Sequence, residues 1–152
     1  MTASGVLQGE YEPSSSKFVR DQVELYERTG GQEGDTLMDT GMPVIILSTR
    51  GRSSGKVRKS ALMRVEHDGA YAVIGSQGGA PQDPAWVANL RAAPDEVALQ
   101  DGPTPFAARV REVQGEERQR WWDRAVEAYP PYADYQKKTD RVIPVFVVER
   151  TD

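Results

Sequence analysis

Apolar residues recur at helical spacing in three stretches of this chain. In the first, residues 16–29, they follow an approximately helical period behind a serine that can cap the first turn. A second helix of about two turns is predicted over 84–91, with Asp83 as its N-cap and Pro84 at its first position. The third, 116–128, begins with two glutamates and ends before a Pro-Pro pair, after which we expect a turn.

The remaining apolar runs are short and rich in β-branched residues, which is typical of strands. Buried strands are predicted at 43–49 and 143–148. Asp-Gly pairs at 68–69 and 101–102 lie between strand-like segments and predict two antiparallel hairpins. A doubly wound parallel sheet would need helices between most strands. The expected fold class is therefore mainly β (α+β), with about six antiparallel strands closed into a small barrel and peripheral helices around it.

Length and the polar N-terminus bear on domain organisation. The 152 residues suffice for one domain with its own core. Residues 1–15 are polar and are expected to form a flexible tail ahead of a single domain over 16–152. The start of the chain lacks the basic and apolar parts of a signal peptide, and no run is long enough to span a bilayer. We therefore expect a cytoplasmic protein, with peripheral contact at the inner membrane surface left open.

Positive charge is concentrated in one segment. Residues 50–65 hold six cations and no carboxylate, although the whole chain has a net charge of −4. The cations are Arg50, Arg52, Lys56, Arg58, Lys59 and Arg64. Such a cluster in an acidic protein predicts a bound anion, and a solvated hairpin arm is the alternative. Nucleic acid is not the expected partner, because its binding domains are usually basic overall and interleave aromatic side chains with their cations.

The cationic segment contains a glycine-rich loop, STRGRSSGKVRKS (48–60), that lacks the nucleotide-binding spacing. Gly51 and Gly55 enclose three residues instead of four, and Val57 stands where the magnesium-binding hydroxyl would be. Its backbone N–H groups and arginines can still hold an anion. A second small-residue loop, GSQGG (75–79), precedes a predicted helix and is also anion-receptive. Two such loops on neighbouring strands can hold opposite sides of one phosphorylated cofactor.

The inventory of reactive side chains excludes several chemistries. The chain has no cysteine and a single histidine, His67, beside a hairpin turn. Disulfides, thiolate sites and histidine-rich metal sites are therefore excluded, and no metal site is predicted. An organic cofactor suits such a chain, because it carries the difficult chemistry and needs the protein mainly for binding and orientation.

Three segments in register resemble one protein family. They are TRGRSSGKVRKSAL (49–62), GSQGGAPQDPAWVANLRAAP (75–94) and YPPYADYQKKTDRVIPVFVV (129–148). In this order and at these separations they are similar to the deazaflavin-dependent nitroreductases and quinone reductases, over roughly residues 35–149. The resemblance implies a split β-barrel of the FMN-binding-protein type. It also implies binding of coenzyme F-420, an 8-hydroxy-5-deazaflavin with a phospholactyl and oligoglutamate tail.

The resemblance further implies which residues form the site. The first loop would hold the phosphate and acidic tail, the strand after it would run beside the deazaflavin, and the second loop and short helix would complete the cleft. The implied cofactor-binding residues are Arg52, Ser53, Ser54, Lys56, Arg58, Lys59, Ser60, Ala61, Leu62, Met63, Ser76, Gln77, Gly78, Gly79, Ala85, Trp86 and Asn89. Tyr132 would orient the acceptor or donate a proton, with Tyr129 and Tyr135 on the same substrate side. Packing alone is the alternative for these tyrosines and for Trp86.

The chain departs from the family pattern at three positions. Ser53 and Gln77 stand where the family often has lysine, which would weaken the hold on the cofactor tail. Met63 replaces a common aromatic residue and would alter the choice of substrate.

The implied function is that of an oxidoreductase. It would transfer hydride from reduced coenzyme F-420 to a small electron-poor acceptor such as a quinone, a nitro compound or an activated alkene. The alternatives are a barrel that binds FMN or carries its cofactor without turnover and, with less support, a barrel that binds single-stranded nucleic acid. The sequence leaves open whether the chain is a monomer or a homodimer.

Overall fold

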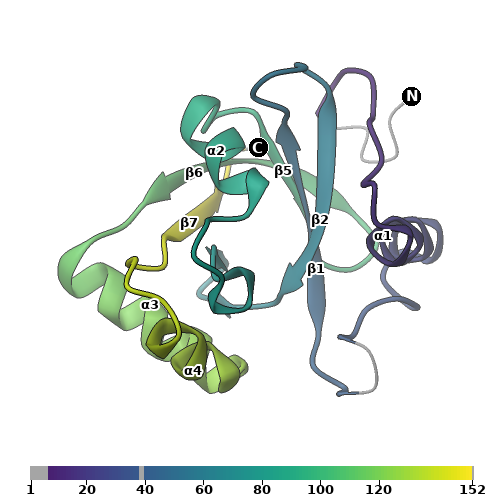
Figure 1. Ribbon diagram of the computed structural model, residues 1–152. Helices are drawn as coiled ribbons and strands as arrows, with labels where there is room; N and C mark the ends of the chain where they lie inside the picture. Colours follow the sequence, from purple (N-terminus) through teal and green to yellow (C-terminus); the bar gives the residue numbers. More distant parts are fainter. Residues whose placement is uncertain (1–6, 38–39, 152) are drawn as a thin grey trace.

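A single antiparallel sheet of seven strands organises the molecule, with helices packed around it (Figure 1). The computed structural model describes residues 7–37 and 40–151. The elements are α1 (Lys17–Thr29), β1 (Val44–Arg50), β2 (Val57–Met63), β3 (Glu66–His67), β4 (Ala70–Ile74), a 3₁₀ turn η1 (Gln77–Gly79), α2 (Ala85–Ala92), β5 (Val97–Gln100), β6 (Pro105–Glu112), α3 (Gly115–Ala128), α4 (Pro131–Lys137) and β7 (Val145–Arg150). The strand order is β2-β1-β5-β6-β7-β4-β3.

The two outermost strands, β2 and β3, follow one another directly in the chain. The Arg64 N–H donates to the Pro43 carbonyl at 3.0 Å, and the Ala72 N–H donates to the Val65 carbonyl at 2.9 Å. These bonds continue the ladders with β1 and β4 through the junction, so β2 and β3 act as one bent strand that joins both ends of the sheet. The expected barrel and antiparallel hairpins are confirmed. The strand number is seven because this bend divides one predicted strand in two.

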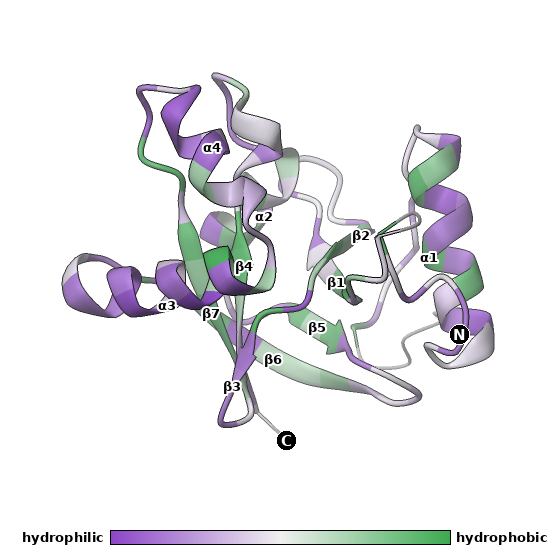
Figure 2. Cartoon of the chain, turned by 90° about the horizontal axis from the view of Figure 1, so that it is seen from below, coloured by the Kyte–Doolittle hydropathy of each residue, from purple (hydrophilic) through white to green (hydrophobic). Residues whose placement is uncertain are grey.

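Alternate residues of the buried strands belong to two different cores. Ile45 and Leu47 pack in a cluster with residues of α2, whereas Val44 and Ile46 pack in a cluster with residues of α1, α3 and α4. A strand covered on both faces needs apolar residues at every position, which explains the continuous run at the start of β1. Hydrophobic residues accordingly lie along the central strands, while α1 and α3 present polar residues outward (Figure 2). α1 lies on the opposite side of the molecule from α3 and α4 (Figure 1).

The N-terminal segment differs from the flexible tail that the sequence predicts. Tyr11 forms a parallel bridge with Val57, where the Glu12 N–H donates to the Val57 carbonyl and the Val57 N–H donates to the Glu10 carbonyl. Leu7 is buried in a small cluster with Val57. Residues 7–12 are therefore an extended strap along β2, because the edge of β2 offers unpaired backbone groups that polar residues can satisfy. Residues 1–6 of the predicted tail lie outside the described residues.

The helices follow the predictions with two corrections. α1 begins after Ser16, whose hydroxyl accepts from the Val19 N–H, as predicted for its cap. α2 begins at Ala85, one residue later than predicted, with Pro84 as N-cap and no side-chain cap. The turn expected after α3 is a further helix, α4, because proline at its start fits the first turn of a helix. None of the helices in the described ranges is long and apolar enough to cross a membrane.

Candidate active site

Two cavities adjoin between the barrel and its covering helices. One, of about 310 Å³, is mainly apolar and lies between β2, the 75–79 loop and α4. The other, of about 950 Å³, is more polar and lies between the 51–58 loop, α2 and the segment leading into α1. Both cavities are lined by Ala61, Gln77, Pro84 and Trp86. They therefore form one groove with an apolar end and a polar end.

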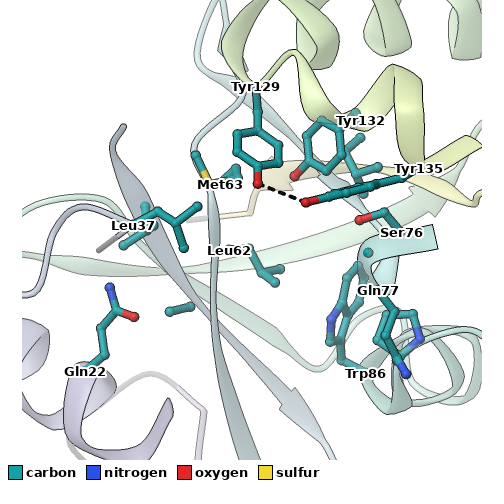
Figure 3. A pocket seen from close by; sticks show the side chains of 15 residues that line it. Gln22, Leu37, Leu62, Met63, Ser76, Gln77, Trp86, Tyr129, Tyr132 and Tyr135 are labelled. Atoms are coloured by element: carbon teal, nitrogen blue, oxygen red, sulfur yellow. Dashed lines mark hydrogen bonds between the residues drawn. The ribbon is translucent and has the colours of Figure 1, made fainter. Parts of the chain in front are cut away.

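Three tyrosines form one wall of the apolar end (Figure 3). The hydroxyls of Tyr129 and Tyr135 are 3.0 Å apart, and the ring of Tyr132 stands edge-on to Tyr129 with centroids 5.0 Å apart. Tyr132 is only 5% exposed, and its hydroxyl has no hydrogen-bond partner among the described residues. Leu62 and Met63 of β2 and Leu37 of the loop after α1 supply apolar walls.

The hydroxyls of Tyr132 and Tyr135 remain protonated in this environment. Burial raises the pKa of Tyr132 well above that of a free tyrosine, with the nearby Tyr129 and Tyr135 acting in the same direction. The hydrogen bond with Tyr129, followed by burial, raises the pKa of Tyr135 to about 12. The apolar end thus offers neutral hydroxyl groups, which can donate a hydrogen bond to an acceptor's oxygen.

The 51–58 loop is held as a compact turn against α2. The Gly51 N–H donates to the Lys56 carbonyl at 2.7 Å, and the Gly55 N–H donates to the Gly51 carbonyl at 2.9 Å. Asn89 of α2 accepts from the Arg52 N–H at 2.9 Å and donates to the Thr49 hydroxyl at 3.1 Å. Asn89 therefore braces the loop as well as lining the polar cavity, and this brace was not visible in the sequence.

Most of the cations in the 50–65 segment are already paired with carboxylates. The pairs are Arg50–Glu96, Lys56–Glu10, Arg58–Glu12, Lys59–Glu27 and Arg64–Asp101. Among the described residues, the guanidinium of Arg52 has no carboxylate partner, and it lines the polar cavity. The charge asymmetry of the sequence is therefore largely balanced inside the fold, which leaves Arg52 as the most available cation.

Lys59 differs most from its expected role. Its side chain is fully buried, and its ammonium lies 2.5 Å from the Glu27 carboxylate of α1. It also lies 4.8 Å from the centre of the Tyr11 ring. The residue thus joins α1 and the 7–12 strap to β2, and it lines the polar cavity without an exposed side chain.

The 75–79 loop ends β4 and turns into the groove. Ser76, Gln77 and Gly78 line the apolar cavity. Gly79 packs closely against α4, because a Cβ there would lie 2.7 Å from the Tyr135 carbonyl oxygen. Its φ of +82° is also a conformation that glycine adopts without strain.

The structure brings nearly all of the sequence-predicted residues to this groove. Lys56 and Gly79 line neither cavity. The predicted residues that line at least one cavity are Arg52, Ser53, Ser54, Arg58, Lys59, Ser60, Ala61, Leu62, Met63, Ser76, Gln77, Gly78, Ala85, Trp86, Asn89, Tyr129, Tyr132 and Tyr135.

Several lining residues were missed because they come from the N-terminal part of the chain. Ser14, Ser15 and Ser16 line the polar cavity, and Gln22 lines the apolar one. The amide of Gln22 donates to the carbonyl oxygens of Gly34 and Thr36, both at 3.0 Å, which ties α1 to the following loop. The serine run preceding a helix cap was the available signal, but a segment interpreted as a tail gave no reason to place it at a site.

Comparisons with known proteins agree with this geometry. Residues 18–150 match the family model described as F420H(2)-dependent quinone reductase. A Mycobacterium tuberculosis protein named F420H(2)-dependent quinone reductase is 33% identical over 137 residues, which cover 88% of this chain and 91% of that protein. A solved structure described as an F420-H2 dependent reductase is 53% identical, covers 70% of this chain and 94% of its own, and has a TM-score of 0.67. Another solved structure, described as a domain-swapped dimer, is 47% identical and has a TM-score of 0.69. The match covers 90% of this chain and 100% of that chain.

Proposed function

Because the chain belongs to the F420H(2)-dependent quinone reductase family, we propose that it transfers hydride from reduced coenzyme F-420 to a quinone. Nitro compounds and activated alkenes are further acceptors to be tested. The observation that carries the proposal is the groove itself, in which a long polar cavity with an unpaired arginine adjoins an apolar cavity with phenolic hydroxyls.

The residues present fit a cofactor with an anionic tail and a flat ring. The polar end has the Arg52 guanidinium and the hydroxyls of Ser14–Ser16, Ser53 and Ser54, which are all hydrogen-bond donors. The shared wall contains Trp86, which is only 8% exposed and whose ring offers a flat apolar surface. When bound, reduced coenzyme F-420 supplies the hydride, so the protein needs no metal, thiol or histidine for that step.

The chain's own contribution is to position the acceptor and stabilise its reduced form. The Tyr132 hydroxyl, neutral at physiological pH, donates a hydrogen bond to the acceptor oxygen on which negative charge develops. The hydrogen-bonded pair of Tyr129 and Tyr135 limits the movement of the Tyr132 ring. Leu37, Leu62 and Met63 exclude water around the acceptor.

A titration with coenzyme F-420 and, in parallel, with FMN tests the cofactor assignment. Protein fluorescence is the readout, because Trp86 lies in the shared wall. We expect saturable quenching by coenzyme F-420 and weaker or no binding of FMN. Binding of FMN in preference to coenzyme F-420 would contradict the proposal and favour the FMN alternative.

We also propose a state of assembly and a location for the chain. One similar structure is described as a domain-swapped dimer, so we infer that a homodimer is accessible to this chain alongside the monomer. Light scattering at several concentrations distinguishes a mass of 16.8 kDa from twice that value. The cytoplasmic location, with at most peripheral contact with the inner membrane surface, is tested by cell fractionation.

A further inference from the structure

Arg141, in the segment between α4 and β7, binds the back of the 75–80 loop. Its guanidinium donates to the carbonyl oxygens of Gly75 at 3.0 Å, Ser76 at 2.7 Å and Ala80 at 2.9 Å. It also donates to the Asp83 carboxylate at 2.7 Å, and its side chain is 17% exposed. One planar group thus satisfies three carbonyls of the loop, and Asp83 balances its charge.

The backbone of this loop has an unusual conformation. Ser76 is right-handed, with φ −77° and ψ −40°, whereas Gln77 and Gly78 have φ of +45° and +64°. Successive residues of opposite hand turn their N–H groups toward one point, which is the geometry of an anion-binding nest. Gln77 is not a glycine, so its positive φ needs support from its surroundings.

Three consecutive N–H groups of the loop remain available, whereas the carbonyls of Gly75, Ser76, Gln77 and Ala80 are paired. The N–H groups of Ser76, Gln77 and Gly78 have no acceptor among the described residues. The carbonyls of Gly75 and Ser76 accept from Arg141, and Ser76 also accepts from the Gly79 N–H at 2.9 Å. Ser76 is buried, Gln77 and Gly78 are exposed, and all three residues line the apolar cavity, so their N–H groups are available to a ligand in the groove.

We propose that Arg141 is a positioning residue for the cofactor groove. By binding the carbonyls of Gly75, Ser76 and Ala80, it keeps the N–H groups of residues 76–78 available to an oxygen of the bound cofactor. The inference rests on the proposed function, because the cofactor is the ligand that these donors would meet. Packing alone does not replace this role: Gly75 lies close to Pro144 and Val87, and its N–H donates to the Pro144 carbonyl at 2.9 Å, but these contacts satisfy no carbonyl of the loop.

The test compares three variants for binding of coenzyme F-420 and for stability. In Arg141→Lys a single ammonium cannot span the three carbonyls, and in Arg141→Ala all four hydrogen bonds are lost. Both are expected to weaken binding of coenzyme F-420 roughly tenfold or more, which is the loss expected when charge-assisted hydrogen bonds that support a site are removed. Guanidinium ion is expected to restore part of the affinity of Arg141→Ala, and an equal concentration of sodium chloride is not.

Arg111→Ala is the matched control. Arg111 forms ion pairs with Glu117 and Glu149 and lines neither cavity, so its removal is expected to leave binding unchanged. Affinity of Arg141→Lys within twofold of the wild type would overturn the proposal, whether or not the melting temperature falls.

A second readout needs no cofactor. In amide nuclear magnetic resonance spectra, Arg141→Lys is expected to shift the signals of residues 75–80, whereas Arg111→Ala leaves them in place. Unchanged signals in Arg141→Lys would also overturn the proposal. This readout does not need Arg141→Ala, so it remains decisive if that variant does not fold. If the wild type does not bind coenzyme F-420 but these signals shift, the proposed function fails while the role of Arg141 in shaping the loop stands.

Discussion

At the scale of single residues, we propose that Tyr132 is the group on which the chemistry depends most directly. It is nearly fully buried, its ring is held by two neighbouring tyrosines, and its hydroxyl lacks a partner among the described residues. A tyrosine that served packing alone would usually satisfy its hydroxyl locally. The free hydroxyl at a cavity wall therefore favours a role toward the acceptor.

Replacing Tyr132 by phenylalanine tests that role. The Tyr132→Phe variant keeps the ring and its packing, so affinity for coenzyme F-420 is expected to stay close to that of the wild type. Loss of one aligned donor is expected to lower kcat on the order of 100-fold. Steady-state kinetics with several quinones measures the effect, and Tyr129→Phe is the control with the smaller loss. A Tyr132→Phe enzyme with wild-type turnover on every acceptor would remove the residue from the mechanism.

The buried tyrosines also predict how stability depends on pH. Burial, followed by the hydrogen bond to Asp101, raises the pKa of Tyr71 to about 12, and burial raises the pKa of Tyr26 and of Tyr132. Above about pH 10 the unfolded chain loses these protons while the folded chain keeps them, so the free energy of unfolding falls as pH rises. Urea unfolding between pH 8 and pH 11 measures it. A stability that stayed constant over this range would show that these hydroxyls ionise as freely in the fold as outside it.

Residues that belong to a recognisable motif could be predicted from the sequence, whereas residues that act by binding backbone atoms could not. Arg52 and Tyr132 were identified from motif and resemblance, and both line the groove. Arg141 lies within one of the quoted segments but was passed over, because its acceptors are carbonyl oxygens and these leave no mark in the sequence.

At the scale of elements, the 7–12 strap changes the interpretation of the cationic loop. Its carboxylates at Glu10 and Glu12 lie 3.4 Å from Lys56 and Arg58, where an acidic cofactor tail is expected to bind. We therefore expect the strap to compete with the tail for these two cations, and a competition between charges is sensitive to salt.

Removing one strap carboxylate tests this competition. The Glu12→Gln variant keeps the length of the side chain and its backbone bonds to β2 but frees Arg58. Affinity for coenzyme F-420 is expected to rise roughly two- to fivefold at low salt, which corresponds to one exposed ion pair, and the gain should shrink at high salt. Asp21→Asn, which removes an exposed carboxylate paired with Lys17, is the matched control. Weaker binding by Glu12→Gln would mean that Glu12 supports the site.

The attachment of α1 depends on the buried pair of Lys59 and Glu27. Lys59→Ala leaves the Glu27 carboxylate nearly buried without its partner, so we expect the free energy of unfolding to fall by about 3–5 kcal/mol. Denaturant unfolding measures the loss. The double variant Lys59→Met with Glu27→Leu removes both charges and should recover much of it. If Lys59→Ala cost less than about 1 kcal/mol, the pair would not hold the helix.

Elements that are determined by residues at their own turns and caps were predicted well from the sequence. Elements that are determined by tertiary contacts were not. The Asp68-Gly69 and Asp101-Gly102 pairs mark hairpin turns through their own backbone preferences, and both hairpins are present. The bend between β2 and β3 has no residue signature, because it results from pairing with β1 on one side and β4 on the other. The strap was missed for the same reason.

At the scale of the whole molecule, the fold places the groove where the barrel meets its helices. The covering helices come from opposite sides, α1 from one and α4 from the other (Figure 1), and residues of both loops line the groove. The fold class followed from hairpins and the lack of helical crossovers. Predicting the location of the groove required the family resemblance as well, because hydrophobic patterning alone does not indicate which end of a barrel is open.

The most direct test of hydride transfer to a quinone is oxidation of reduced coenzyme F-420 by the purified wild type, followed without oxygen by the return of deazaflavin absorbance. The account predicts a rate that saturates with quinone concentration, exceeds the protein-free rate by orders of magnitude, and drops sharply in Tyr132→Phe. Tight binding of reduced coenzyme F-420 with no acceleration over the protein-free rate, for quinones, nitro compounds and activated alkenes alike, would contradict it and leave a barrel that carries its cofactor without turnover.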